Sequence, residues 1–241
     1  MTPFARSSAL ERLKNWQKLR ITEAEAPSYF NGAPQNVGII LGEASHGLTD
    51  IDLDCAEAVA VAPYFLPHTG AIFGRGSRPG SHWLYQINLS KSHDTAVLTY
   101  RDPCAGDDDK AMIVELRIGG GGKGAQTVFP GSVHESGEQI KWDEAGDPAE
   151  LVDGGHDLER RVRLLAAAAL WRKQARHDTA MAIGGLLARG GWKQPDAKLF
   201  MEAVAKAAGD EEWRDRRKAV EDTFNTVPEA TRRPAYRPSS S

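Results

Sequence analysis

Polar and apolar residues alternate most regularly over residues 48–54, where the chain reads Leu-Thr-Asp-Ile-Asp-Leu-Asp. This period of two predicts a strand with one buried face, because successive side chains point to opposite sides. One side carries three carboxylates: Asp50, Asp52 and Asp54. Carboxylates on one strand face repel each other, so the pattern predicts a compensating divalent cation held by oxygen ligands. A solvated edge strand with an acidic face is the alternative interpretation.

Short apolar runs around this segment predict further strands. Residues 37–41 precede it and are expected to form a hairpin with it across the loop 42–47. A helix is expected over residues 56–62, where Pro63 would end it. The remaining strands are expected at residues 71–73, 83–87, 95–100, 111–118, 128–130 and 140–142.

Helical periodicity dominates the last third of the chain, and an amphipathic helix is also expected near the N-terminus, over residues 7–21. The later helices are expected at residues 158–174, 179–188, 195–207 and 211–224. Together these elements predict an α+β fold in which a mixed-sheet catalytic domain precedes a small C-terminal helical bundle. The expected boundaries are 1–150 for the sheet domain, 151–230 for the bundle and 231–241 for a disordered tail.

Composition places the chain among soluble globular proteins, since 41% of its 241 residues are hydrophobic and 26% are charged. No apolar segment at the N-terminus reads as a signal peptide. The longest apolar run, residues 164–171, is too short to span a membrane. Cys55 and Cys104 have no zinc-binding spacing. We therefore expect a cytoplasmic protein without a membrane partner.

Charge is unevenly distributed along the chain. Residues 1–150 contain 13 lysines and arginines against 20 acidic residues, whereas residues 151–241 contain 17 against 13. The net charge is −3, but several N-terminal acids are candidate metal ligands, which lowers the negative field that a phosphate would meet. Charge therefore neither supports nor excludes a nucleic-acid partner.

A second informative stretch is the glycine-rich segment 74–82, which contains two arginines and two serines. Glycines allow close approach of the backbone to a ligand, and cationic and hydroxyl side chains can bind phosphate. The segment therefore predicts a phosphate-binding loop, although flexible surface loops have the same composition. His82 at its end could contact a phosphate or be an ordinary half-buried histidine.

Glu115 interrupts the apolar run 111–118, where an unpaired carboxylate would be costly. It is a natural third carboxylate for the site around Asp52 and Asp54; the alternative is a salt bridge with Arg117. Four glycines and Lys123 follow, and they suggest either a backbone that approaches a charged ligand or a flexible hairpin.

Three carboxylates beside a phosphate-binding loop are the groups that metal-dependent phosphoryl transfer requires. Two or three carboxylates can hold two divalent ions that activate an attacking hydroxyl and stabilise the leaving group of an in-line phosphoryl transfer. The residues thus favour nucleotidyl transfer, but they do not separate a polymerase from another nucleotidyltransferase or a nuclease.

In this order, the segments 47–54, 73–85, 114–117 and 126–134 resemble the bifunctional primase-polymerase family of the archaeo-eukaryotic primase superfamily. The likeness covers about residues 30 to 145 and is greatest to the versions from phages and mobile elements. It implies an archaeo-eukaryotic primase-like sheet, primer synthesis and DNA polymerisation. The implied cofactor is Mg²⁺ or Mn²⁺, and the implied partners are a single-stranded DNA template, a primer and dNTPs or NTPs.

The resemblance also implies roles for individual residues. Asp52 and Asp54 match the metal-binding DxD motif, Glu115 matches the third acid, and His82 matches the histidine that contacts the phosphates of the incoming nucleotide. Asp50 lies outside the motif and is expected to support it. The nucleotide-binding set implied by the matching segments and the glycine-rich loops is Arg75, Ser77, Arg78, Gly80, Ser81, His82, Lys123 and Gln126.

Two other functions remain open from the sequence. One is a gap-filling polymerase of the same superfamily, which extends primers without starting them. The other is a catalytically silent replication-initiator module that binds DNA. A helicase, as a further domain or a partner, is a possible addition to either enzyme.

Overall fold

A computed structural model describes residues 16–30, 32, 34–88, 96–102, 112–120, 124–152, 155–171 and 176–232. Most of the expected helix 7–21, Lys123 and nearly all of the expected tail lie outside the described residues. Within residues 16–21 only a 3₁₀ turn, η1 (Trp16–Lys18), is present. The chain divides into two compact units, one comprising residues 1–52, 69–99 and 115–156 and the other comprising residues 53–68, 100–114 and 157–241.

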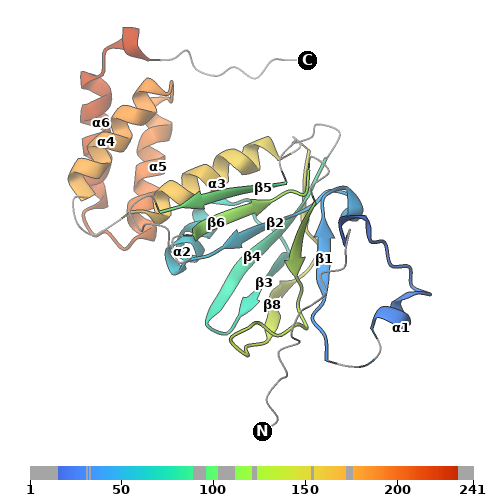
Figure 1. Cartoon of the computed structure of the whole chain (residues 1–241). Helices are drawn as coiled ribbons and strands as arrows, with labels where there is room; N and C mark the ends of the chain where they lie inside the picture. The colour runs from blue at the N-terminus through green and yellow to red at the C-terminus, as the bar shows by residue number, and fades with distance from the viewer. Residues whose placement is uncertain are drawn as a thin grey trace. The chain divides into compact units, whose positions relative to one another are not determined.

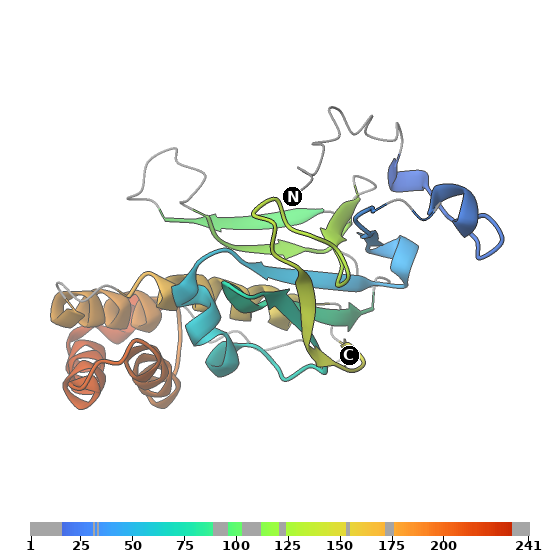
Figure 2. The same cartoon turned by 90° about the horizontal axis from the view of Figure 1, so that it is seen from below.

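The main sheet places the acidic strand in its interior, between two other strands (Figures 1 and 2). Its six principal strands lie in the order β5 (Val97–Arg101), β6 (Met112–Arg117), β2 (Leu48–Leu53), β4 (Arg78–Ile87), β3 (Ala71–Arg75) and β8 (Ile140–Ala145). A seventh strand, β9 (Ala149–Leu151), pairs with β4 in parallel. The antiparallel β2–β4 register sets Asp52 opposite His82.

The predicted hairpin between residues 37–41 and the acidic strand is wrong. Strand β1 (Gly38–Leu41) instead pairs along its length with β7 (Ala125–Val128), and it reaches β2 only through one bridge between Gly42 and Leu48. Gly42 has a positive φ of 82°, and a Cβ there would lie 2.7 Å from the carbonyl oxygen of Gly119. The positive φ, which glycine adopts without strain, lets the chain turn between β1 and β2, and the missing side chain lets the backbone lie close to Gly119.

Strand β2 is buried on both faces, which corrects the expectation of one buried face. Ile51 and Leu53 are fully buried, but so is Asp50, and Asp52 is only 9% exposed. Burial of carboxylates is tolerated when cationic partners satisfy them, and such partners are described below.

The segment 74–82 is mostly strand, so the expectation of a loop there is also wrong. Strand β3 ends at Arg75, Gly76 and Ser77 form a tight turn, and β4 begins at Arg78. The Gly74 backbone packs against the β4 backbone too closely to leave room for a Cβ. The glycine therefore permits strand pairing here rather than a flexible loop.

Six helices accompany the sheet in the described residues, which confirms a mixed α+β fold. Their bounds are α1 (Ala26–Tyr29), α2 (Ala56–Phe65), α3 (His156–Ala169), α4 (Arg176–Arg189), α5 (Gln194–Ala207) and α6 (Trp213–Thr226). Pro63 does not end α2, because the Leu66 N–H still bonds the Ala62 carbonyl in the final turn.

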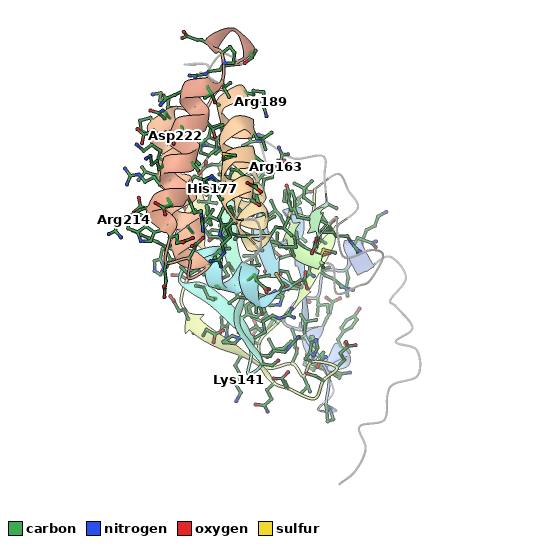
Figure 3. The ribbon with its side chains drawn as sticks, turned by 90° about the vertical axis from the view of Figure 1, so that its left-hand side faces the viewer. Lys141, Arg163, His177, Arg189, Arg214 and Asp222 are labelled. Atoms are coloured by element: carbon green, nitrogen blue, oxygen red, sulfur yellow. The ribbon has the colours of Figure 1, made fainter. Side chains whose placement is uncertain are left out.

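The four expected C-terminal helices are present, and α4, α5 and α6 pack against one another. Their status as a separate bundle domain stays a prediction. Arg214 and Asp222 lie on the outer side of α6 (Figure 3). None of the helices in the described ranges is both long enough and apolar enough to cross a membrane.

A buried ion pair fixes the turn between α5 and α6. Asp210 is 4% exposed, and its Oδ2 lies 3.2 Å from Arg216 Nε and 3.4 Å from Arg176 Nη1. Its Oδ1 accepts a hydrogen bond from the Glu212 N–H. Burial disfavours the carboxylate, but the hydrogen bonds and the arginines outweigh burial and hold the pKa of Asp210 below its usual value.

We expect Asp210→Asn to lower the free energy of unfolding by about 3 kcal/mol at pH 7, because it removes the buried carboxylate that pairs with both Arg216 and Arg176. Since the folded-state pKa lies below the unfolded value of about 4, the unfolded state binds more protons as the pH falls through this range. The contribution is therefore present above about pH 4 and is lost below it. Urea unfolding of both proteins from pH 7 to pH 3 should show the difference shrinking; a difference independent of pH would contradict this account.

Candidate functional site

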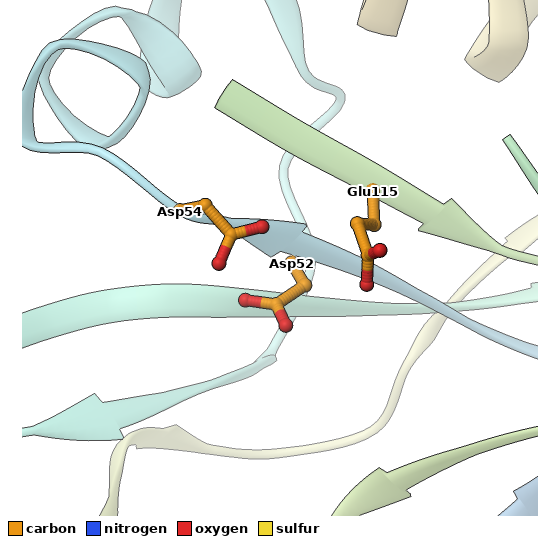
Figure 4. Close-up of side chains that lie close together, drawn as sticks. All are labelled: Asp52, Asp54 and Glu115. Carbon is orange, nitrogen blue, oxygen red and sulfur yellow. The ribbon is translucent and has the colours of Figure 1, made fainter. Parts of the chain in front are cut away.

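Three carboxylates converge where β2 ends. Asp52 lies on β2, Asp54 directly follows it, and Glu115 lies on the neighbouring strand β6. One oxygen atom from each carboxylate lies within 4.8 Å of the other two (Figure 4). The structure thus brings together the three acids named from the sequence, and their function as ligands stays a prediction.

The donor set suits a hard divalent cation. All three ligands offer carboxylate oxygens, which Mg²⁺ and Mn²⁺ prefer over nitrogen or sulfur. Asp52 is buried, whereas Asp54 and Glu115 are half-buried, so the cluster is open to solvent on one side. Like charges this close need a nearby cation.

Arg117 provides that cation in the described structure. Its Nη2 lies 2.5 Å from Asp52 Oδ2 and 2.5 Å from Glu115 Oε2, and its Nη1 lies 3.5 Å from Asp50 Oδ2. Burial disfavours the charged guanidinium, but the carboxylates outweigh burial and raise the pKa of Arg117. From the sequence, Arg117 is expected only as an alternative salt-bridge partner of Glu115. Its position two residues after Glu115, on the same face of the strand, is the sequence signal that places its side chain near the acids.

His82 approaches the same acids from β4. Its Nδ1 lies 3.1 Å from Asp50 Oδ2, and its Nε2 lies 3.6 Å from Asp52 Oδ1. The imidazole stacks on the Phe73 ring at a centroid distance of 4.5 Å and an angle of 7°. Burial opposes protonation of the ring, but the charge and hydrogen bond of Asp50, together with the charge of Asp52, outweigh burial and raise the pKa of His82. Stacking on Phe73 fixes the plane of the imidazole ring, and the contact with Asp50 fixes the direction of its Nδ1 atom.

The pKa values of Asp50 and Asp52 are shifted in opposite directions, although both carboxyls are buried beside the same cations. Burial raises the pKa of both carboxyls, but for Asp50 the charge and hydrogen bond of His82, together with Arg117, outweigh burial and lower the pKa. For Asp52 burial prevails, helped by the neighbouring charges of Asp50 and Glu115, and the pKa is raised. Asp50 is thus an ion that is paired on two sides, and its supporting role stays a prediction.

Residues of the expected phosphate loop are held by two carboxylates outside the cluster of three acids, Glu138 and Asp143. Ser77 donates hydrogen bonds to Glu138 from its N–H and its hydroxyl, both at 2.7 Å. Arg75 Nε lies 3.1 Å from Ser77 Oγ and 3.4 Å from Glu138 Oε2. The Gly80 N–H donates to Asp143 Oδ2 at 2.7 Å. Among the described contacts, Arg75 and Ser77 are therefore joined to Glu138, not to the three acids.

The other expected nucleotide contacts are scattered over the sheets. Arg78 begins β4 opposite Arg75, and Ser81 is buried within β4. Gln126 lies on β7, opposite Ile40 of β1. Lys123 lies outside the described residues. A role for these side chains in nucleotide binding stays a prediction.

Aromatic rings continue the site beyond His82. Phe73 packs edge-to-face against Trp142 at 5.5 Å and against Phe129 at 6.0 Å, and those two rings are 5.1 Å apart. Phe73 is fully buried, whereas Trp142 is 36% exposed. The His82 imidazole thus rests on a packed aromatic cluster, which limits its movement.

One comparison with known proteins gave a match. The family model Prim-Pol, described as the N-terminal domain of bifunctional DNA primase/polymerase, matches residues 2–153. This range contains all three clustered acids, Arg117 and His82. No curated protein and no solved structure shows significant similarity to the chain.

We expect Phe73→Ala to lower the free energy of unfolding by about 3 kcal/mol or more, because it removes a fully buried ring that packs on His82, Phe129 and Trp142. Chemical denaturation of the variant measures this loss. Tyr64→Ala, at a ring that is 54% exposed, is the matched control and should cost less than about 1 kcal/mol. Equal losses of unfolding free energy in the two variants would show that packing in the aromatic cluster does not stabilise the fold more than an exposed ring does.

Proposed function

The chain belongs to the Prim-Pol family of bifunctional DNA primases/polymerases, and we propose from this that it starts primers on a single-stranded DNA template and extends them. The observation that carries the proposal is the convergence of the Asp52, Asp54 and Glu115 carboxylates to within 4.8 Å in a chain of this family. Family membership supports nucleotidyl transfer on DNA, and the acids support the use of divalent ions in it.

Asp52, Asp54 and Glu115 would hold Mg²⁺ or Mn²⁺ through their carboxylate oxygens. Bound divalent ions would supply Lewis-acid activation of the primer hydroxyl and neutralise charge on the triphosphate of the dNTP or NTP. The protein's own contribution is to keep these carboxylates on two adjacent strands and directly after one of them, so that the ligands are positioned before the substrates arrive.

His82 would orient the incoming triphosphate. Asp50 engages Nδ1 at 3.1 Å, which leaves Nε2, on the Asp52 side, as the nitrogen that can donate to a phosphate oxygen. Stacking on Phe73 holds the ring in that orientation. A fixed donor costs little reorganisation when charge develops on the phosphate.

The glycine-rich hairpin would add further contacts to the triphosphate. Arg75 and Ser77 have the cationic and hydroxyl groups for this, but Glu138 now occupies both of them. A nucleotide that uses these side chains would have to replace the Glu138 carboxylate with its own phosphate oxygens.

The C-terminal helices would contribute to holding the template. Residues 151–241 carry a net charge of +4, which favours contact with a phosphate backbone. Arg189, at the end of α4, is a candidate for this role, together with Arg172 and Lys173 outside the described residues. Arg176, at the start of α4, is held against the buried Asp210 instead. A solvated helix face would account for the same charges.

Primer synthesis on a single-stranded DNA template, with labelled nucleotides and Mn²⁺, tests the proposal. We expect product from the wild-type protein with and without a primer. Asp52→Asn/Asp54→Asn should lose at least about a hundredfold in rate, because the carboxylates that hold the ions are gone. Chelation of the divalent ions should abolish the reaction.

Asp222→Asn is the matched control, since it removes an exposed carboxylate on α6 (Figure 3) and should leave the rate unchanged. Product that forms only with a primer would contradict primer synthesis and leave an extending polymerase. No product under either condition would contradict both enzyme functions and favour a silent DNA-binding module.

A further inference from the structure

Arg117 occupies the position that a cation should occupy among the proposed metal ligands. We propose that it is the resident counter-ion of the metal-free site and that Asp50 retains it when Asp52 and Glu115 bind metal. The inference rests on the proposed function, because it assumes that these acids are ligands. It gives Arg117 and Asp50 positioning roles of their own.

The contacts of Arg117 put it in competition with a metal ion. A single nitrogen, Nη2, lies 2.5 Å from an oxygen of Asp52 and 2.5 Å from an oxygen of Glu115. A divalent ion would use the same carboxylates, and two cations in one small space repel each other. Metal binding would therefore displace Nη2 from at least one of these oxygens.

Asp50 has the position required to keep the displaced guanidinium satisfied. It contacts the other terminal nitrogen, Nη1, at 3.5 Å, and it is not one of the three clustered acids. Its side chain is fully buried, so it cannot turn to solvent. A guanidinium that is only 20% exposed is disfavoured without an anion, and Asp50 would keep Arg117 paired when Asp52 and Glu115 bind metal.

Asp50 also restrains the second nearby cation. His82 engages Asp50 through Nδ1 and lies 3.6 Å from Asp52 through Nε2. With Asp50 in place, both His82 and Arg117 have a partner that is not a metal ligand. Without it, the guanidinium and the imidazole would have only ligand carboxylates to pair with, and both would compete more strongly with the metal.

Direct Mn²⁺ binding tests this arrangement without any polymer synthesis. Free Mn²⁺ would be counted by electron paramagnetic resonance during titration of the wild-type protein, Arg117→Met, Asp50→Asn and the double variant. We expect Arg117→Met to bind Mn²⁺ about tenfold more tightly, because the competing cation is gone. Asp50→Asn should bind about tenfold more weakly, and most of that loss should disappear in the Arg117→Met background.

Thermal unfolding with and without Mn²⁺ checks that the variants fold. Metal-free Arg117→Met should melt below the wild-type protein, since its acids repel each other, and it should gain more from Mn²⁺. Arg117→Lys keeps the positive charge, but the ammonium group is too compact to contact three carboxylates at once. Its Mn²⁺ affinity should therefore fall between those of the wild type and Arg117→Met. Arg101→Met, at an exposed arginine on β5, is the matched control and should bind as the wild type does.

Three results would overturn the inference. Weaker Mn²⁺ binding by both Arg117→Met and Arg117→Lys would mean that Arg117 supports the site instead of standing in for the metal. An equal effect of Asp50→Asn in both backgrounds would mean that Asp50 acts only through its charge. A wild-type protein that binds Mn²⁺ but makes no product would contradict the proposed function alone, whereas one that binds no Mn²⁺ would contradict both.

Discussion

The pairing of one buried carboxylate with two cations underlies the structure of this site. Asp50 has no exposed surface, and it meets His82 on one side and Arg117 on the other. These partners come from β4 and β6, the two strands that flank β2. Three adjacent strands are thus joined by charge as well as by backbone hydrogen bonds, and the acids beside Asp50 acquire defined positions as a consequence.

Apart from Asp54, which directly follows β2, the site is built on strands and not on loops, which matters for its precision. Asp52, Glu115, Arg117 and His82 all project from paired strands, where the backbone has little freedom. Even the hairpin that carries Arg75 and Ser77 is tied to Glu138. Ligands held in this way need little rearrangement, so the binding energy of a substrate can be used elsewhere.

Local patterns in the sequence predicted the elements of the site but not their partners. Alternation identified the acidic strand, and a lone acid in an apolar run identified Glu115, because both signals lie within a few residues. The pairing of β1 with β7 joins distant segments, and the expectation of a local hairpin failed for that reason. The contacts of Arg117 with Asp50 and Asp52 likewise depend on β6 lying beside β2, which no local pattern specifies.

The acidic strand has a repeat that bears on how its alignment is chosen during folding. A slip of β2 by two residues would keep an aspartate on the same face at each of the central positions, so side-chain alternation alone hardly separates the two alignments. The observed alignment sets Asp52 opposite His82 and leaves Asp50 between His82 and Arg117. A slip that set Asp52 in the place of Asp50 would set Asp50 in the place of Leu48, opposite Gln86 and away from His82 and Arg117. Ion pairing therefore selects one register from two that apolar packing would distinguish poorly.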